Sequence, residues 1–400
     1  MAMVKAMKAI PRYRPFGGPA LFTAGFRPFF LGGALWAALA VPLWLFLYHG
    51  SLIAPTALPP AIWHAHEMIY GYGAAVVAGF LLTAVPNWTG RMPLQGWPLI
   101  AITIVWLAGR IVVLWSDIFG TSVTACVDAA FLLLFTASIA REVIVGRNWR
   151  NLGIVAALTV LSGGNLLIHA EVLQLADTAD IGIRIGIAML LSLIALIGGR
   201  IIPSFTTNWL RKKTPHASLP APPGLLDKVA LGITVLAILA WVCFPGRGAT
   251  SVALLVAGIA VMVRLCRWRG LATLSEPLLI VLHIGYGWLS FGLILLGVNG
   301  LYEIMIPSAA LHALTVGAVG TMTLAVMTRA TLGHTGQELT AGPGTTVIYV
   351  LVSISAVLRT ASPLLDNFSN IALVSAGATW SAAFLLFAML YGKHLARSRS

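Results

Sequence analysis

The sequence has 400 residues, of which 59% are hydrophobic and 9% are charged, and its mean hydropathy is +0.92. A water-soluble domain carries roughly 25% charged and 45–50% apolar residues, so the composition excludes an ordinary soluble protein. The net charge of +13 does not indicate a nucleic-acid-binding protein, because the basic residues gather in the tails and in alternate connections between apolar runs.

Twelve apolar runs are long enough to cross a membrane, since about 20 apolar residues in a helix span the hydrocarbon core. Lipid cannot hydrogen-bond to the backbone, so these runs are expected to be helices. The sequence therefore predicts an all-α integral membrane protein with one membrane domain over 29–392. The predicted runs are 29–48, 61–85, 98–115, 119–140, 152–174, 180–202, 225–244, 248–267, 276–297, 306–328, 344–361 and 369–392.

The basic residues predict the orientation of the chain. They lie in the tails 1–28 and 393–400 and in the connections after the fourth, sixth and eighth runs. Basic connections stay on the cytoplasmic side, so both tails are expected to be cytoplasmic. The first tail has no apolar core or cleavage site of a secretory signal. The lipid bilayer is thus a predicted partner, and nucleic acid is not.

A threefold repeat of four helices is a further prediction, with units 29–150, 151–270 and 271–392. Polar turns end the second, sixth and tenth runs, and Thr89, Thr206 and Thr335 align there. In that register His66 falls opposite His312. Chance similarity between apolar segments is the alternative explanation.

Four histidines lie within about two helical turns of one depth in the membrane. His64 and His66 begin the second run, His312 begins the tenth, and His169 ends the fifth. Ionisable residues in membrane segments are functional candidates, so we predict a haem or metal site, with His66 and His312 as axial ligands of one haem. His64 and His66 are roughly 200° apart around a helix and cannot both face one iron, which makes His64 the replacement candidate.

A second metal centre could use the remaining histidines. His64, His169 and His283 are its candidate ligands, although His283 lies at a different depth, where a structural hydrogen bond is equally consistent. His64 and Met68 are one helical turn apart and could form a soft copper pair. The alternative for each buried histidine is a hydrogen bond that bridges two helices.

Buried arginines form a second set of candidates. Arg110, Arg184 and Arg359 lie in the outer halves of their runs, and arginine binds carboxylates such as haem propionates in a bidentate manner. The alternative is pairing with nearby aspartates, Arg110 with Asp117 and Arg359 with Asp366.

Four acidic residues are candidate proton donors. Glu67, Glu171 and Glu303 are expected at the outer surface, whereas Asp128 stands alone in the middle of the fourth run. A charge at that depth costs roughly 3 kcal/mol or more, so Asp128 is expected to be protonated or paired. It could relay protons or make a buried hydrogen bond.

Several motifs together resemble the NnrS family of bacterial membrane proteins. They are Gly25–Phe30 (GFRPFF), Trp63–Met68 (WHAHEM), Pro86–Gly90 (PNWTG) and Arg329–Gly336 (RATLGHTG). The resemblance implies a haem- and copper-containing protein of the bacterial inner membrane, with b-type haem. It also implies a link to nitric oxide, denitrification and nitrosative stress, with nitric oxide as ligand or substrate and an unknown electron donor. Reduction of nitric oxide by an oxidoreductase, sensing and protection are all compatible with it.

A looser likeness is to the catalytic subunit of haem–copper oxidases and nitric oxide reductases, which also has twelve helices in three arcs and haem-binding histidines on helices two and ten. This sequence lacks the other histidines of that pattern, so its copper site would be absent or rebuilt. A transporter with structural or proton-coupled histidines, or a sensory partner protein, are the rival functions. Transporter sites lie near the midplane, whereas these histidines gather near one face.

Overall fold

The computed structural model describes residues 16–214 and 216–397, and the regular structure in those ranges is helical. Residues 1–15 and 398–400 of the two predicted tails lie outside the described ranges. Twelve helical spans in the described part are long and apolar enough to cross a membrane, which confirms the predicted fold class of a multi-pass membrane protein. The spans are Phe26–Tyr48, Pro60–Thr89, Trp97–Leu114, Thr121–Val145, Trp149–Val172, Ala179–Lys213, Leu225–Cys243, Gly248–Cys266, Pro277–Tyr302, Pro307–Thr335, Pro343–Leu364 and Asp366–Ala396.

Several spans are composed of more than one helical segment. The second, sixth and tenth spans each contain a π-helical segment, at Glu67–Gly73, Ile194–Gly198 and Ala313–Gly320. The α-helices are α1 (Phe26–Tyr48), α2 (Pro60–His66), α3 (Ala74–Thr89), α4 (Trp97–Leu114), α5 (Ser116–Phe119), α6 (Thr121–Val145), α7 (Leu152–Val172), α8 (Ala179–Leu193), α9 (Gly199–Lys213), α10 (Leu225–Cys243), α11 (Gly248–Cys266), α12 (Pro277–Tyr302), α13 (Pro307–His312), α14 (Thr321–Thr335), α15 (Pro343–Ala361) and α16 (Ser369–Ala396).

The second and tenth spans begin and end in the same way. A proline stands at the start of each, Pro60 in α2 and Pro307 in α13, where its missing N–H costs nothing because that group has no intrahelical partner. Gly90 and Gly336 follow the last residues of α3 and α14 with φ of 70° and 76°. This left-handed conformation is one that glycine adopts without strain and that commonly ends helices.

The second and tenth spans are the most buried of the described spans, and the sixth packs against both of them. α8 of the sixth span contacts the π-helical segments of both the second and the tenth, and the Tyr72 hydroxyl of the second contacts that of Thr323 in the tenth. The remaining spans pack around them in chain order, and α1 closes the arrangement against α16. Residues on these three spans can therefore meet at the centre of the protein.

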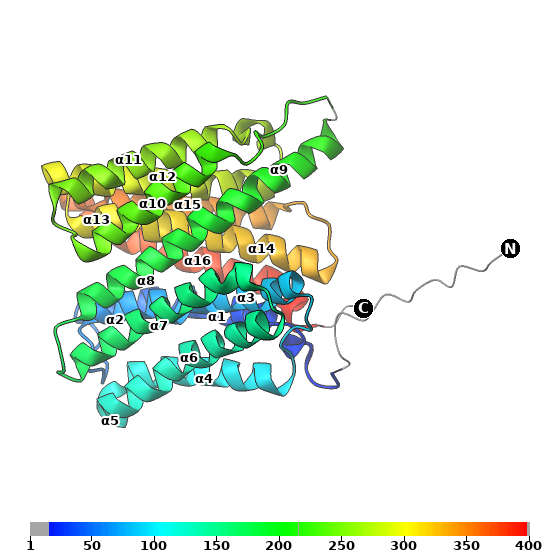
Figure 1. Cartoon of the computed structure of the whole chain (residues 1–400). Helices are drawn as coiled ribbons and strands as arrows, with labels where there is room; N and C mark the ends of the chain where they lie inside the picture. Colours follow the sequence, from blue (N-terminus) through cyan, green and yellow to red (C-terminus); the bar gives the residue numbers. More distant parts are fainter. Residues whose placement is uncertain (1–15, 215, 398–400) are drawn as a thin grey trace.

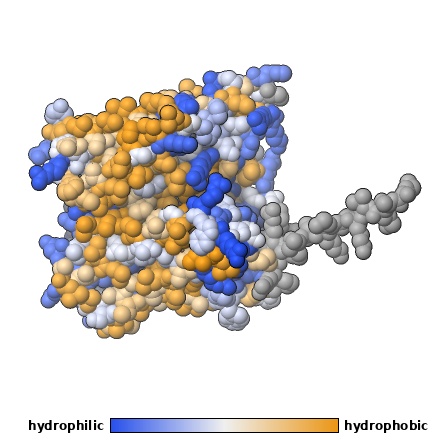
Figure 2. Space-filling model, viewed as in Figure 1, coloured by the Kyte–Doolittle hydropathy of each residue, from blue (hydrophilic) through white to orange (hydrophobic). Residues whose placement is uncertain are grey.

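The start of α1 and the end of α16 lie at one end of the bundle, and α2 and α13 lie at the other (Figure 1). Arg27 at the start of α1 donates hydrogen bonds to the carbonyls of Leu395 and Arg397 at the end of α16, at 2.8 Å each. Apolar side chains cover much of the side of the bundle, and hydrophilic ones gather towards its two ends (Figure 2). This distribution suits a membrane-spanning protein. The threefold repeat, its boundaries and the cytoplasmic position of the tails stay predictions.

The predicted runs at 61–85, 180–202 and 306–328 are shorter than the spans that contain them. These helices continue through polar residues beyond the apolar run, and Pro86 and Pro203 lie inside α3 and α9. Hydropathy locates the part of a helix that suits lipid, whereas the helix itself continues as long as its backbone hydrogen bonds do.

Candidate functional site

The second span separates two clusters of functional side chains. α2 ends at His66 and the π-helical segment begins at Glu67. His64 lines a cavity, whereas His66 and Glu67 are fully buried in a polar network on another face. The rotation of roughly 100° per residue along a helix explains why neighbours in sequence serve different clusters.

The cavity holds two histidines from facing spans. His64 of α2 and His312 of α13 have ring centroids 6.3 Å apart and planes that differ by 14°. Trp44 of α1 stacks on His64 at 4.3 Å, and the Nδ1–H of His312 donates to the Ser308 carbonyl at 2.5 Å. That bond leaves Nε2 of His312 as its electron-pair donor. In the described part of the chain, Nδ1 of His64 has no hydrogen-bond partner.

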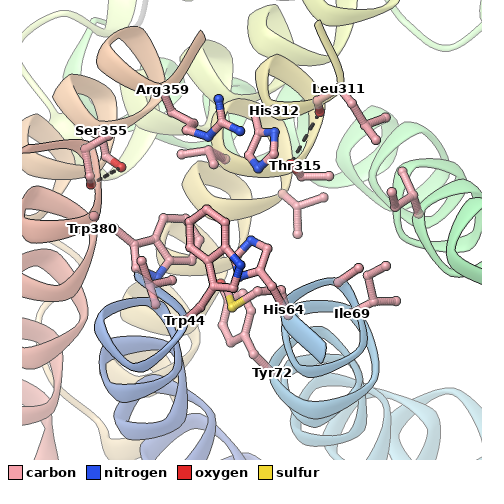
Figure 3. A pocket seen from close by; sticks show the side chains of 18 of the residues that line it. Trp44, His64, Ile69, Tyr72, Leu311, His312, Thr315, Ser355, Arg359 and Trp380 are labelled. Carbon is pink, nitrogen blue, oxygen red and sulfur yellow. Dashed lines mark hydrogen bonds between the residues drawn. The ribbon is translucent and has the colours of Figure 1, made fainter. Parts of the chain in front are cut away.

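The rest of the cavity is almost entirely apolar, with aromatic walls. Its volume is about 140 Å³, and it is partly open to the surface of the protein. Tyr72, Trp380 and Met68 contribute to its walls, and Arg359 of α15 is the one arginine or lysine among its described lining residues. Figure 3 shows Arg359 next to His312, with Trp44, His64 and Tyr72 across the cavity. The apolar walls, Arg359 and the two histidines would complement a large apolar ligand that carries anionic groups and a metal centre.

The second cluster, which we call the buried polar cluster, consists of His66, Glu67, Arg110, Asp128, Asn165 and His169. Each of these residues is at most 1% exposed. His66 Nδ1 lies 3.0 Å from Glu67 Oε1, so its N–H donates to that carboxylate. His66 Nε2 lies 3.1 Å from Asp128 Oδ2 and 2.9 Å from Asn165 Oδ1.

Arg110 of α4 joins the two carboxylates of the buried polar cluster. Its Nη1 donates to Glu67 Oε2 at 2.7 Å, and its Nη2 donates to Asp128 Oδ1. The close approach of Arg110 depends on Gly71, where a Cβ atom would clash with the guanidinium and lie 2.9 Å from Glu67 Oε2. Charges removed from water are stable only when paired and hydrogen-bonded, and this arrangement supplies such pairing.

Asp128 receives further contacts from α7. His169 Nε2 and Asn165 Nδ2 each lie 2.9 Å from Asp128 Oδ2. One ligand atom from each of His66, Asp128 and His169 lies within 4.8 Å of the others, so these residues could hold a metal ion. The buried polar cluster is therefore a histidine–aspartate group of metal-binding type that connects α2, α6 and α7.

The structure does not bring the predicted axial pair together. His312 faces His64, the replacement candidate, while His66 faces Asp128 and Asn165. His66 is turned away because its two nitrogens are engaged by acidic and amide groups on α6 and α7 and by Glu67. Asp128, which was expected to be protonated or paired, is paired in the structure, since four side chains from three other spans contact its carboxylate.

The arginine candidates take different positions. Arg110 pairs with Glu67 and Asp128 rather than with Asp117. Arg184 donates to the Val242 carbonyl at 3.2 Å and is outside the cavity. Arg359 is the candidate that lines the cavity.

The remaining candidates lie outside both clusters. His283 on α12 contacts the Leu279 carbonyl at 3.1 Å, and its ring lies beside Gly270. The Glu171 carboxylate accepts from the backbone N–H groups of Thr178 and Ala179 at 2.9 and 2.6 Å, where α8 begins. Glu303 is exposed at the end of α12.

Sequence reasoning missed Trp44, Tyr72 and Asn165. Asn165 could have been found, because it precedes His169 by one helical turn on the same face of α7. The two aromatic residues carry no such signal among many apolar neighbours.

The comparisons with known proteins agree with the motifs in the sequence. No curated protein matches the chain. The family described as NnrS protein matches residues 20–399, which include all twelve spans and both clusters. This membership suggests a membrane protein related to the nitric oxide response. Because the match covers nearly the whole chain, the protein belongs to the NnrS family.

Proposed function

We propose that this protein binds haem in the cavity between His64 and His312 and acts on nitric oxide there. The observation that carries the proposal is the pair of nearly parallel imidazole rings, which come from facing spans and have centroids 6.3 Å apart. Two imidazoles that bind one metal ion from opposite sides through bonds of about 2.0–2.1 Å have ring centroids roughly 6 Å apart. The measured separation matches that value.

The other walls of the cavity suit a porphyrin. Trp44, Tyr72 and Trp380 offer flat aromatic surfaces, and aromatic side chains pack favourably against other rings. Arg359 could pair with a propionate, since guanidinium groups bind carboxylates bidentately. His64 and His312 would hold the metal of a haem, the aromatic walls would contact its ring, and Arg359 would pair with a propionate.

The apolar cavity also suits nitric oxide, a small uncharged gas that dissolves in lipid and needs no polar channel. A bound haem would supply an iron centre that takes nitric oxide as a ligand or exchanges an electron with it. If His64 and His312 both held the haem, it would supply mainly electron transfer, and if only one of them held it, it would supply a position for nitric oxide. The activity assay below distinguishes reduction from binding or sensing. The electron donor is outside this proposal, and copper, with the His64–Met68 pair in the cavity wall, stays a prediction.

Spectra of the purified full-length protein test the haem assignment. The wild type should show a Soret band and sharp bands in its reduced-minus-oxidised spectrum. His64→Ala and His312→Ala should each lose most of this signal while still inserting. His66→Ala is the decisive comparison, because the earlier prediction from sequence requires it to lose haem and the cavity geometry requires it to keep haem. His283→Ala is the matched control for loss of a buried histidine elsewhere. A colourless wild type would overturn the proposal and favour the transporter alternative.

A nitric oxide electrode tests the activity. Haem-loaded protein with an artificial electron donor should consume nitric oxide faster than the His64→Ala variant. Equal rates would reject the enzyme, and a spectral change on adding nitric oxide without turnover would identify a binding or sensory protein.

A further inference from the structure

A second cavity lies beside the first one, which contains His64 and His312. Its volume is about 80 Å³, and its described lining residues come from the second, sixth and tenth spans. Leu190 of α8 and Val319 of the tenth span line both cavities, and each is at most 6% exposed. Two buried apolar side chains therefore lie at the boundary between the two cavities.

The second cavity is partly open to the side of the bundle. Phe80, Ile197 and Val326 line it and are half-buried, and each belongs to a span that is long and apolar enough to cross a membrane. No charged side chain lines this cavity in the described part of the chain. Because apolar groups face the opening, it suits contact with lipid chains, and a molecule dissolved in lipid could enter there.

The polar groups at the boundary are satisfied by one another. The Tyr72 hydroxyl, in the first cavity, contacts the Thr323 hydroxyl, in the second. Thr323 donates to the Val319 carbonyl at 2.7 Å, so Tyr72 is the donor to Thr323. A water molecule in a cavity needs roughly two to four polar partners, whereas apolar cavities stay dry and bind apolar guests such as xenon. The second cavity therefore favours small apolar occupants.

We propose that the second cavity takes up small uncharged gases from the lipid and passes them to the first cavity between Leu190 and Val319. The destination rests on the proposed function, because a haem between His64 and His312 would occupy the first cavity and leave the second as the adjoining space for nitric oxide. A gas of this kind needs no hydrogen-bond partner at the boundary. Core side chains change rotamer within a packed interior, so brief movements of Leu190 would join the two cavities. Ions would be excluded, since their transfer into apolar surroundings is strongly unfavourable.

Xenon tests the second cavity without haem or activity. Crystals of the full-length protein held under xenon pressure should show anomalous scattering from xenon in the second cavity, as a dry apolar cavity of about 150 Å³ binds this gas. Val326→Phe adds a ring in the wall of the second cavity and should remove the signal. Val256→Phe is the matched control, because that residue is 47% exposed on α11, and it should keep the signal. Wild-type crystals without xenon in the second cavity would overturn the proposal.

Carbon monoxide, an uncharged diatomic gas like nitric oxide, tests the passage. It is released from the reduced haem by a light flash, and its rate of rebinding from solution is measured. Leu190→Phe should slow rebinding about tenfold, the effect of a barrier raised by about 1.4 kcal/mol, whereas Leu190→Ala should accelerate it. Opposite effects at one residue separate a passage from a general disturbance of packing. Leu236→Phe, 68% exposed on α10, is the matched control and should keep the wild-type rate.

The two measurements separate failure of the passage from failure of the haem assignment. Equal rebinding rates in the wild type, Leu190→Phe and Leu190→Ala, with the Soret band intact, would overturn the passage even if xenon binds. If Leu190→Phe does not insert, Val319→Phe narrows the same boundary from the tenth span and replaces it. A wild type without a Soret band would remove the proposed function instead, and the xenon result would then decide whether the second cavity takes up apolar gas.

Discussion

Removing the guanidinium of Arg110 should destabilise the protein far more than removing an exposed one. In Arg110→Met, the carboxylates of Glu67 and Asp128 lose a donor at 2.7 Å and a second, closer one, at positions no more than 1% exposed. Breaking a buried ion pair in this way costs about 3–5 kcal/mol. Arg141→Met is the control, because that side chain is 66% exposed and exposed pairs contribute about 0–1 kcal/mol.

Titration with sodium dodecyl sulfate in mixed micelles gives the free energy of unfolding, and this value is compared between Arg110→Met, Arg141→Met and the wild type. The double variant Arg110→Met with Glu67→Gln provides a stricter test. It removes one negative charge together with the positive one, so it should be more stable than the sum of the single effects predicts, by about 0.5–3 kcal/mol. The charge-pairing explanation of the buried polar cluster is refuted if Arg110→Met costs no more than Arg141→Met, or if the double variant shows simple additivity.

Three further predictions concern packing and orientation. Gly71→Ala should destabilise the protein in the same titration, because its Cβ would clash with the guanidinium of Arg110, whereas Gly163→Ala has open space and should be neutral or stabilising by about 0.5–1 kcal/mol. Tyr72→Phe removes the hydroxyl contact between the second and tenth spans and should cost about 0.5–1.5 kcal/mol; no measurable loss would contradict a role in joining them. A cysteine introduced at 216–219 should react with reagents only from the cytoplasmic side, and labelling from the other side would reverse the predicted orientation.

The sequence was sufficient to predict the twelve helices, because lipid imposes a long apolar run on every span. It also placed His64, His66 and His312 near one level. It could not decide which of His64 and His66 faces His312, because that depends on the rotation of α2 about its axis. The rotation is set by residues distant in sequence, above all Asp128 and Asn165, which engage His66.

The same limit explains why the sequence did not show which residues pair with Asp128. Its partners lie on three other spans, at sequence separations of 18 to 62 residues, and no local pattern connects them. Helical spacing within α7 does relate Asn165 to His169, so that part of the cluster was accessible from sequence. Long-range charge pairing could be inferred only from the general rule that a buried carboxylate needs partners.

The two clusters are mechanically connected through the second span. His64 and His66 are two residues apart, so the contacts that hold His66 also fix the direction of His64. Apolar contacts alone allow a membrane helix to rotate or slide at little cost, since lipid and protein interior are similarly apolar. The buried polar cluster holds one face of α2 through charged hydrogen bonds. If α2 rotated or slid, each of these groups would be left unpaired in hydrocarbon, which is unfavourable. The buried polar cluster therefore fixes one orientation of α2. That orientation places the ring centroids of His64 and His312 6.3 Å apart, and the proposed haem site depends on this distance.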